Sequence, residues 1–333
     1  MSILNILAIL DEVDAKFVLL LCHHNADPDA ICSAYAFQGL LSKVKPHIAA
    51  EIGAGQGISR LSKHILKRLP ITVNLNPNVE KADAILLLDT NTIQQLDSLS
   101  EKVARIKVPI IVIDHHAAHP ETERVARLCV TDEKASSTCE IIYDFYRQLN
   151  IKPDLNAAKA LFLGITFDTR HFVLANSATF KTIAALSDIG VNPQEELAAL
   201  ALPMDFSERV ARIKACRRAK LVKMESWIIA FSHVSAYQAS AARALVDLGA
   251  HLAAVAGQKN DKIEISLRCT SEFHQATGIH LGRDIAKPLG EYLQGMGGGH
   301  ATAAGVNGIG SIEKGLKRCL RLVKEKLAVT NHQ

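Results

Sequence analysis

Three short apolar runs in this chain each end at residues that can bind a metal ion. The runs are Phe17–Leu21, Ala84–Leu88 and Pro109–Ile113. The residues that follow them are His23, Asp27, Asp29, Asp89, Asp114, His115 and His116. Short continuous runs rich in Val, Leu and Ile are typical of buried parallel strands. Because ligands bind outside the carboxyl ends of such strands, the pattern predicts an α/β fold with one site at that edge.

The first of these turns is ambiguous when it is taken alone. An aspartate after a strand also serves as an N-cap, and Asp27 or Asp29 could cap a helix that begins near Ala30. Repetition of the pattern after two further strands favours the metal site. An eighth residue, Asp168, follows the apolar run Ala160–Phe167, which indicates a helix because its apolar residues recur at helical spacing.

Together these eight residues offer carboxylate oxygens and imidazole nitrogens, with no thiolate among the candidates. Ligands of this kind suit Mn²⁺, Mg²⁺ or Zn²⁺. Their number exceeds what a single ion needs. We therefore infer a two-metal centre, an arrangement that phosphatases and nucleases use to stabilise both the attacking and the leaving oxygen.

The order of these motifs along the chain resembles that of the DHH phosphoesterases, a family named for the triplet Asp114-His115-His116. The matching motifs of the first half are His23-x-x-x-Asp27-x-Asp29-Ala30, Asp89-Thr90, Asp114-His115-His116 and Gly164-Ile165-Thr166-Phe167-Asp168-Thr169. Two later stretches, Ile263–Arg268 and Gly297–Gly305, are similar to the substrate-binding half called DHHA1. Members often have Pro in place of Ala26 and Gly in place of Cys32, and neither departure removes a ligand.

The resemblance implies two domains joined by a helix. The expected parts are a DHH domain over residues 1–203, with a parallel sheet and helices on both faces, a linker helix over 204–223, and a smaller α/β DHHA1 domain with a mixed sheet over 224–333. The linker is placed at Pro203, and the helix that follows it is predicted over Ser207–Lys223. A turn at Lys259-Asn260-Asp261 predicts a hairpin in the second domain.

The resemblance also implies a role for each ligand. The ligands of one ion are His23, Asp27 and Asp89, and those of the other are Asp29, Asp89, His115 and Asp168. Asp89 then bridges two divalent ions, for which Mn²⁺ is the first choice and Mg²⁺ the alternative. His116 is expected to contact the phosphoryl oxygen or the leaving group, and Asp114 to orient an imidazole. His116, Asp114 and Asp89 are the expected catalytic residues.

Hydroxyl groups precede another predicted helix, Ser137–Leu149. The triplet Ser136-Ser137-Thr138 has side chains that suit an N-cap. The same hydroxyls and the free backbone N–H groups of the first turn would also serve a phosphate. The sequence leaves both interpretations open.

Charge and glycine content favour an anion site in the second half. Through Asp205 the chain has 19 Lys and Arg against 24 Asp and Glu, a net charge of −5, while the remainder has 19 against 10, a net charge of +9. A glycine-rich loop at Gly295–His300 would expose backbone N–H groups to anionic oxygens. Arg268 offers the planar fork that suits phosphate. The predicted substrate-binding residues are Arg268, Gly297, Gly298, Gly299 and His300.

Among phosphoesterase activities, the leading hypothesis is an oligoribonuclease of the nanoRNase type that releases mononucleotides from short RNA. Action on 3′-phosphoadenosine 5′-phosphate is a further expectation. The alternatives are a cyclic dinucleotide phosphodiesterase, a RecJ-like single-strand exonuclease and a non-catalytic nucleotide or RNA binder. With ten Phe and one Trp the chain lacks an aromatic ladder for long single strands, which favours short substrates.

Partners and compartment follow from the same considerations. The expected partner is short single-stranded RNA or DNA, or a nucleotide, and a homodimer is considered. No apolar run approaches the roughly 18 residues of a membrane helix, and the start of the chain lacks the pattern of a signal peptide. Seven scattered cysteines without a C-x-x-C pair fit a reducing compartment. We therefore expect a cytoplasmic protein without membrane contact.

Overall fold

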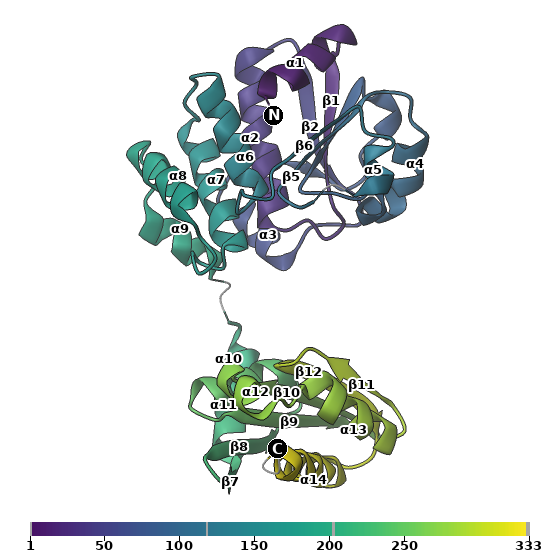
Figure 1. Ribbon diagram of the computed structural model, residues 1–333, viewed down its shortest axis with the longest axis vertical. Helices are drawn as coiled ribbons and strands as arrows, with labels where there is room; N and C mark the ends of the chain where they lie inside the picture. Colours follow the sequence, from purple (N-terminus) through teal and green to yellow (C-terminus); the bar gives the residue numbers. More distant parts are fainter. Residues whose placement is uncertain (1, 118, 202–203, 331–333) are drawn as a thin grey trace. The chain divides into compact units, whose positions relative to one another are not determined.

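The computed structural model describes residues 2–117, 119–201 and 204–330. The chain divides into two compact units, Met1–Leu202 and Pro203–Gln333, and each unit is described by itself (Figure 1). Pro203, the predicted position of the linker, lies outside the described residues. Within the described ranges no helix combines the length and the apolar character that crossing a membrane requires.

The first unit is built on a six-stranded sheet whose strands all run parallel. Their order is β3 (Val73–Asn74), β2 (Ala49–Ala54), β1 (Phe17–Cys22), β4 (Ala84–Leu88), β5 (Ile110–Asp114) and β6 (Leu128–Thr131). The register pairs Cys22 with Leu88 on the adjacent strand, and Leu88 with Ile113 on the next. The chain therefore leaves three neighbouring strands at one level, which is where the predicted ligands begin.

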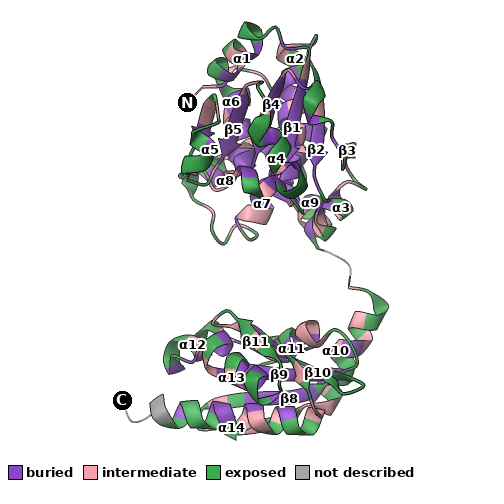
Figure 2. Cartoon of the chain, turned by 90° about the vertical axis from the view of Figure 1, so that its right-hand side faces the viewer, coloured by how far each residue is buried: buried purple, intermediate pink, exposed green. Residues whose placement is uncertain are grey.

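Helices cover both faces of this sheet, as predicted. They are α1 (Ile3–Glu12), α2 (Pro28–Val44), α3 (Arg60–Ile65), η1 (Val79–Lys81), η2 (Ile93–Leu99), α4 (Ser100–Arg105), α5 (Pro120–Glu123), α6 (Thr138–Gln148), α7 (Leu155–Asp168), α8 (Ser177–Asp188) and α9 (Pro193–Leu200). On one face α1, α2, α6 and α7 pack against strand residues such as Leu20. On the other, η1, η2 and α4 pack against strand residues such as Leu87. The central strands are consequently buried along their whole length (Figure 2).

The second unit has a six-stranded mixed sheet, as predicted. The order is β11 (Met296–Gly299), β12 (Ala303–Ile309), β10 (Lys262–Cys269), β9 (Leu252–Lys259), β8 (Trp227–His233) and β7 (Lys220–Met224). β8 and β9 pair in parallel and the other neighbours are antiparallel. The helices are α10 (Phe206–Arg218), α11 (Gln238–Asp247), α12 (Ser271–Thr277), the π-helical turn η3 (Leu281–Ala286), α13 (Lys287–Tyr292) and α14 (Ile312–Thr330). Helices α10 and α11 contribute to one apolar core. The other apolar core contains residues of α12, η3, α13 and α14.

The helix predicted over Ser207–Lys223 was wrong at its C-terminal end. Helix α10 ends at Arg218, and Lys220 begins a strand that pairs with β8. The physical reason is alternation, because Val222 and Met224 pack against the core while Lys223 between them is exposed. Buried alanines of α10 pack against those of α11, so this segment is an integral part of the second unit.

A second correction concerns the glycine-rich stretch, which was predicted to be a loop. Met296–Gly299 forms the edge strand β11 and pairs with β12. An added Cβ at Gly297 would clash with the carbonyl group of Ala286 in η3. Glycine is therefore needed there because the helical backbone packs directly against the strand.

Candidate metal centre

The turn after β1 places its acidic residues by ordinary helix capping. Asp27 is the N-cap of α2, and its Oδ1 accepts hydrogen bonds from the backbone N–H groups of Asp29 (3.0 Å) and Ala30 (3.2 Å). The same oxygen lies 3.8 Å from Nε2 of His23. Burial opposes ionisation of Asp27, but its hydrogen bond and charge interaction with His23 hold its pKa below the usual value. The capping and ligand interpretations of this turn are therefore compatible.

Asp89 lies at the centre of the cluster. It follows β4 with a φ of 51°, a left-handed conformation that is unfavourable for a residue other than glycine. Its backbone N–H donates to the carbonyl of Ile113 (3.0 Å), which holds the turn against β5. Burial, and then the charges of Asp114, Asp27 and Asp168, raise the pKa of Asp89 to about 7. Asp89 thus combines an unfavourable backbone conformation with a nearly buried carboxyl group that lies among other negative charges.

The triplet at the end of β5 contributes one imidazole to the interior and one to the surface. Both the backbone N–H and the ring Nδ1 of His116 lie 2.8 Å from Oδ1 of Asp114. This hydrogen bond to Asp114 raises the pKa of His116 to about 9, although partial burial opposes the shift. The His116 side chain is 57% exposed, so it remains accessible to a ligand. His115 instead points to Asp168, with Nε2 and Oδ2 3.0 Å apart.

Asp29 and Asp168 complete the cluster from α2 and α7. Asp29 is fully buried, and its carboxylate accepts hydrogen bonds from the backbone N–H groups of Thr138 (2.7 Å) and Cys139 (3.1 Å). Burial and the charges of Asp89 and Asp168 raise its pKa well above the usual value. Asp168 is the last residue of α7, which confirms the predicted helix.

Glycine is required at Gly164, where α7 passes closest to this carboxylate. A Cβ at that position would lie 2.9 Å from Oδ1 of Asp29 and would clash with Sγ of Cys139. The close approach brings the C-terminal end of α7, and with it Asp168, to the cluster. The motif glycine therefore acts through helix packing rather than through a turn.

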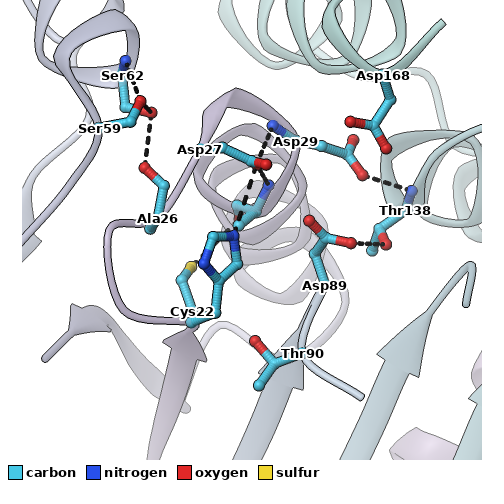
Figure 3. A network of polar contacts seen from close by, with 12 residues as sticks. Cys22, Ala26, Asp27, Asp29, Ser59, Ser62, Asp89, Thr90, Thr138 and Asp168 are labelled. Atoms are coloured by element: carbon cyan, nitrogen blue, oxygen red, sulfur yellow. Dashed lines mark hydrogen bonds and ion pairs between the residues drawn. The ribbon is translucent and has the colours of Figure 1, made fainter. Parts of the chain in front are cut away.

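The ligand atoms form three overlapping groups in which all atoms lie within 4.8 Å of one another. The groups are His23, Asp27 and Asp89; Asp29, His115 and Asp168; and Asp89, Asp114, His115 and His116. Asp89 belongs to two of them, and its Oδ1 lies 3.7 Å from Nε2 of His115. All eight residues predicted at this edge thus lie together in the structure, from four separate segments of the chain. Figure 3 shows Asp27, Asp29, Asp89 and Asp168 converging above the strands.

The chemistry of the donor set fits divalent cations. Two buried polar atoms, Asp114 Oδ2 and His115 Nε2, have no hydrogen-bond partner among the described residues. Nε2 of His115 lies 3.0 Å from Oδ2 of Asp168 without the alignment of a hydrogen bond, and the two atoms are close enough to bind one cation together. Several buried carboxylates without a balancing cation are costly, and bound divalent ions would remove that cost.

The sequence did not single out Thr138 as part of this site. Ser137 is the N-cap of α6, as the hydroxyl triplet predicted. The backbone N–H groups of Thr138 and Cys139 are occupied by Asp29, so they are not free for a phosphate. The Thr138 hydroxyl donates to Oδ1 of Asp89 (3.2 Å). The clue in the sequence was the triplet itself, but its partners are more than forty residues away.

The predicted substrate-binding residues lie on the second unit, and they have different surroundings. An added Cβ at Gly297 or Gly299 would meet backbone atoms, whereas at Gly298 it would meet nothing within 4 Å. Gly298 pairs with Gly305, which also borders open space. Of the three motif glycines, Gly298 is therefore the one that leaves room above the sheet.

Basic groups border this open part of the second sheet. Arg268 is on β10 and pairs with Ala303, next to the row that joins Ser266 to Gly305. Burial, and then the positive charge of Arg243, lower the pKa of Arg268. His300 follows directly after β11 and is exposed. The positive charges of Arg268 and Arg243 thus interact beside an uncovered sheet surface, an environment that favours an anion.

The parallel sheet and the carboxylates and imidazoles at its carboxyl edge define an α/β domain with a candidate site for divalent cations. The model of the "DHH family, N-terminal domain" matches residues 17–165. An uncharacterized protein of Methanocaldococcus jannaschii is 36% identical over 306 residues, which cover 90% of this chain and 89% of that protein. The chain belongs to the DHH family of phosphoesterases.

Two further similarities bear on activity and fold. The "Probable bifunctional oligoribonuclease and PAP phosphatase NrnA" of Streptococcus mutans is 28% identical over 209 residues, or 62% of this chain and 63% of that protein. The crystal structure of an exopolyphosphatase-related protein from Bacteroides fragilis has a TM-score of 0.64 at 18% identity, with 98% of each chain covered. The second similarity supports the fold of the whole chain.

Proposed function

We propose that this protein is a two-metal phosphodiesterase that hydrolyses short oligonucleotides to mononucleotides and also acts on 3′-phosphoadenosine 5′-phosphate. The observation that carries the proposal is the position of Asp89, which belongs to one ligand group with His23 and Asp27 and to another with Asp114, His115 and His116, in a chain of the DHH family. A carboxylate has two oxygens, so one residue can serve two cations and reduce their mutual repulsion. Similarity to NrnA supports the choice of substrate.

The residues of the centre would divide the work as follows. His23 and Asp27 would hold one ion and Asp29, His115 and Asp168 the other. Asp89 would contribute to both, since it groups with His23 and Asp27 and its Oδ1 lies 3.7 Å from Nε2 of His115. When bound, two ions of this kind lower the pKa of a water molecule toward neutrality and stabilise charge on phosphoryl oxygens. Mn²⁺ is our first choice and Mg²⁺ the alternative, because both take carboxylate oxygens as ligands.

His116 would serve the substrate directly. The hydrogen bond to Asp114 raises the pKa of His116, which favours the protonated imidazole, and the same 2.8 Å contact orients the ring. A protonated, half-exposed imidazole can donate a hydrogen bond to a phosphoryl oxygen or a proton to the leaving oxygen. No covalent enzyme intermediate is required.

The second unit would bind a substrate phosphate through Arg268, Gly298 and His300. Gly298 and Gly305 leave the sheet surface uncovered. Nη1 of Arg268 donates to the carbonyl of Leu267 (2.8 Å), so a bidentate contact with phosphate would use its Nε and Nη2. Gly297 would contribute by keeping β11 close to η3, and Gly299 by keeping it close to β12. Since few aromatic side chains are available to stack further bases, each added nucleotide should gain little binding.

The test is a panel of 5′-labelled RNA and DNA strands of two, five and twenty nucleotides, assayed with Mn²⁺ and with Mg²⁺. We expect kcat/KM to be highest for about two to five nucleotides, since stacking adds little beyond that length. Linear pApA and cyclic di-AMP, assayed side by side, separate the oligonucleotide activity from a cyclic dinucleotide phosphodiesterase. Equal or rising kcat/KM on the twenty-nucleotide strand would favour the RecJ-like alternative, and no metal-dependent turnover would favour a binder.

A further inference from the structure

Thr138 contacts two of the proposed metal ligands at once. Its backbone N–H donates to Oδ2 of Asp29 (2.7 Å), and its side-chain hydroxyl donates to Oδ1 of Asp89 (3.2 Å). Asp29 and Asp89 are the carboxylates of different ligand groups. Figure 3 shows Thr138 beside both side chains, with one dashed contact to each.

The helix itself does not explain this arrangement. Ser137 caps α6, since its side chain accepts from the backbone N–H of Glu140, so a second hydroxyl is not needed for capping. The first N–H groups of a helix have no partner within the helix. Here the carboxylate of Asp29 satisfies those of Thr138 and Cys139, one with each oxygen.

Burial makes these contacts specific. Thr138 and Asp29 are fully buried and Asp89 is nearly so, which shields the three groups from competing water. Each carboxylate oxygen retains a second lone pair, so a hydrogen bond from Thr138 orients the oxygen without blocking a cation. Residues that contact metal ligands in this manner often determine how well the ligands bind.

We infer that Thr138 is a positioning residue that holds Asp29 and Asp89 in one geometry and thereby couples the two ion sites. The backbone N–H of Thr138 has a fixed position at the start of α6, where it binds Asp29. The hydroxyl of the same residue therefore holds Asp89 at a fixed position relative to Asp29. An ion held by His23, Asp27 and Asp89 would thereby fix Asp89 in the orientation needed by the ion at Asp29. The inference rests on the two-ion centre proposed above.

The experiment compares Thr138→Val with Thr138→Ser in the full chain. Valine keeps the shape and the backbone N–H but removes the hydroxyl, while serine keeps the hydroxyl. Thr277→Val is the matched control, because its buried hydroxyl donates to the carbonyl of Phe273 in the second unit. Mn²⁺ binding is measured by calorimetry on metal-free protein, and the melting temperature of each metal-free variant is recorded.

We expect Thr138→Val to bind Mn²⁺ about tenfold more weakly, the lower end of effects seen for groups that orient metal ligands. Its metal-free melting temperature should change no more than that of Thr277→Val. Thr138→Ser should restore wild-type affinity. With a dinucleotide, Thr138→Val should lower kcat and leave KM unchanged, because the substrate-binding residues are untouched.

Three results would overturn the inference. Wild-type Mn²⁺ affinity in Thr138→Val would show that the hydroxyl does not position Asp89. A folded Thr138→Ser that binds as poorly as Thr138→Val would assign the effect to packing of the methyl group. If Thr138→Val does not fold, Thr138→Ala replaces it in the same comparison. A wild-type chain that binds fewer than two ions would overturn the proposed centre itself, which distinguishes that failure from the first two.

Discussion

The two units place their candidate sites on sheets in different ways. In the first unit the ligands follow parallel strands, whose carboxyl ends meet at one edge and bring residues from distant parts of the chain together. In the second unit the candidate residues lie on the surface of a mixed sheet, beside strands that carry glycine. The site of the first unit concentrates negative charge, which bound cations would neutralise. The site of the second unit has an open sheet surface at Gly298 and Gly305, on which a substrate could lie. Loss of a residue should therefore affect metal in one unit and substrate in the other.

Removal of the shared carboxylate should have the largest effect. Asp89→Asn keeps the side-chain shape but weakens metal binding, and we expect kcat/KM to fall at least about a hundredfold, since even groups that only orient metal ligands cost ten- to a hundredfold. Activity and bound metal are both measured, the latter by elemental analysis. Asp188→Asn, at an exposed position on α8, is the control and should change neither. Full metal occupancy with normal turnover in Asp89→Asn would remove the bridge from the proposal.

A pair of glycine substitutions separates packing from open space in the second unit. Gly297→Ala should destabilise the unit by about 1–3 kcal/mol or more, because the new Cβ would clash with η3. Gly298→Ala should change stability by less than about 0.5 kcal/mol, since the position is open. Denaturant unfolding measures both. We expect Gly298→Ala to raise KM if substrate oxygens approach β11, and equal destabilisation by both substitutions would contradict the assignment of faces.

Substitution of the basic groups tests the division of labour between the units. Arg268→Ala or His300→Ala should raise KM on a dinucleotide about tenfold, the scale of one hydrogen bond to a charged group, with metal content unchanged. Arg321→Ala, at an exposed position on α14, is the control for loss of positive charge. Wild-type KM and kcat in both variants would exclude these residues from substrate binding.

In the metal-free protein, stability should also depend on pH. The pKa of Asp89 is about 7 in the fold against an ordinary 3.8, and that of His116 is about 9 against 6.5. Both groups bind more protons in the folded state within these intervals, so stability should fall as pH rises from about 4 to about 9. Thermal melts with and without Mn²⁺ measure it, and the ion should reduce the slope because it replaces the protons. A metal-free melting temperature that rises across this range would contradict the burial of an uncompensated carboxylate.

Much of the first unit could be predicted because its signals are local. Continuous apolar runs such as Ala84–Leu88 identify buried strands, and helical spacing before Asp168 correctly indicated a helix. Strands that run parallel must end at one edge, so the ligands could be grouped without coordinates. The DHH triplet and its companion motifs then identified the family. In the second unit the mixed sheet was predicted, but the end of α10 was missed because Lys220–Met224 is too short for its alternation to stand out.

The sequence by itself determined that carboxylates and imidazoles collect at one edge of the first sheet. Apolar runs identify the parallel strands, and the residues that follow each run lie at the edge where those strands end. The tertiary structure alone decided which atoms meet there. The contacts of Thr138 with Asp29 and Asp89 join segments 109 and 49 residues apart, and no local pattern encodes such pairings. It also decided that Gly297 serves packing while Gly298 borders open space, since identical residues in one strand differ only in what lies against each face.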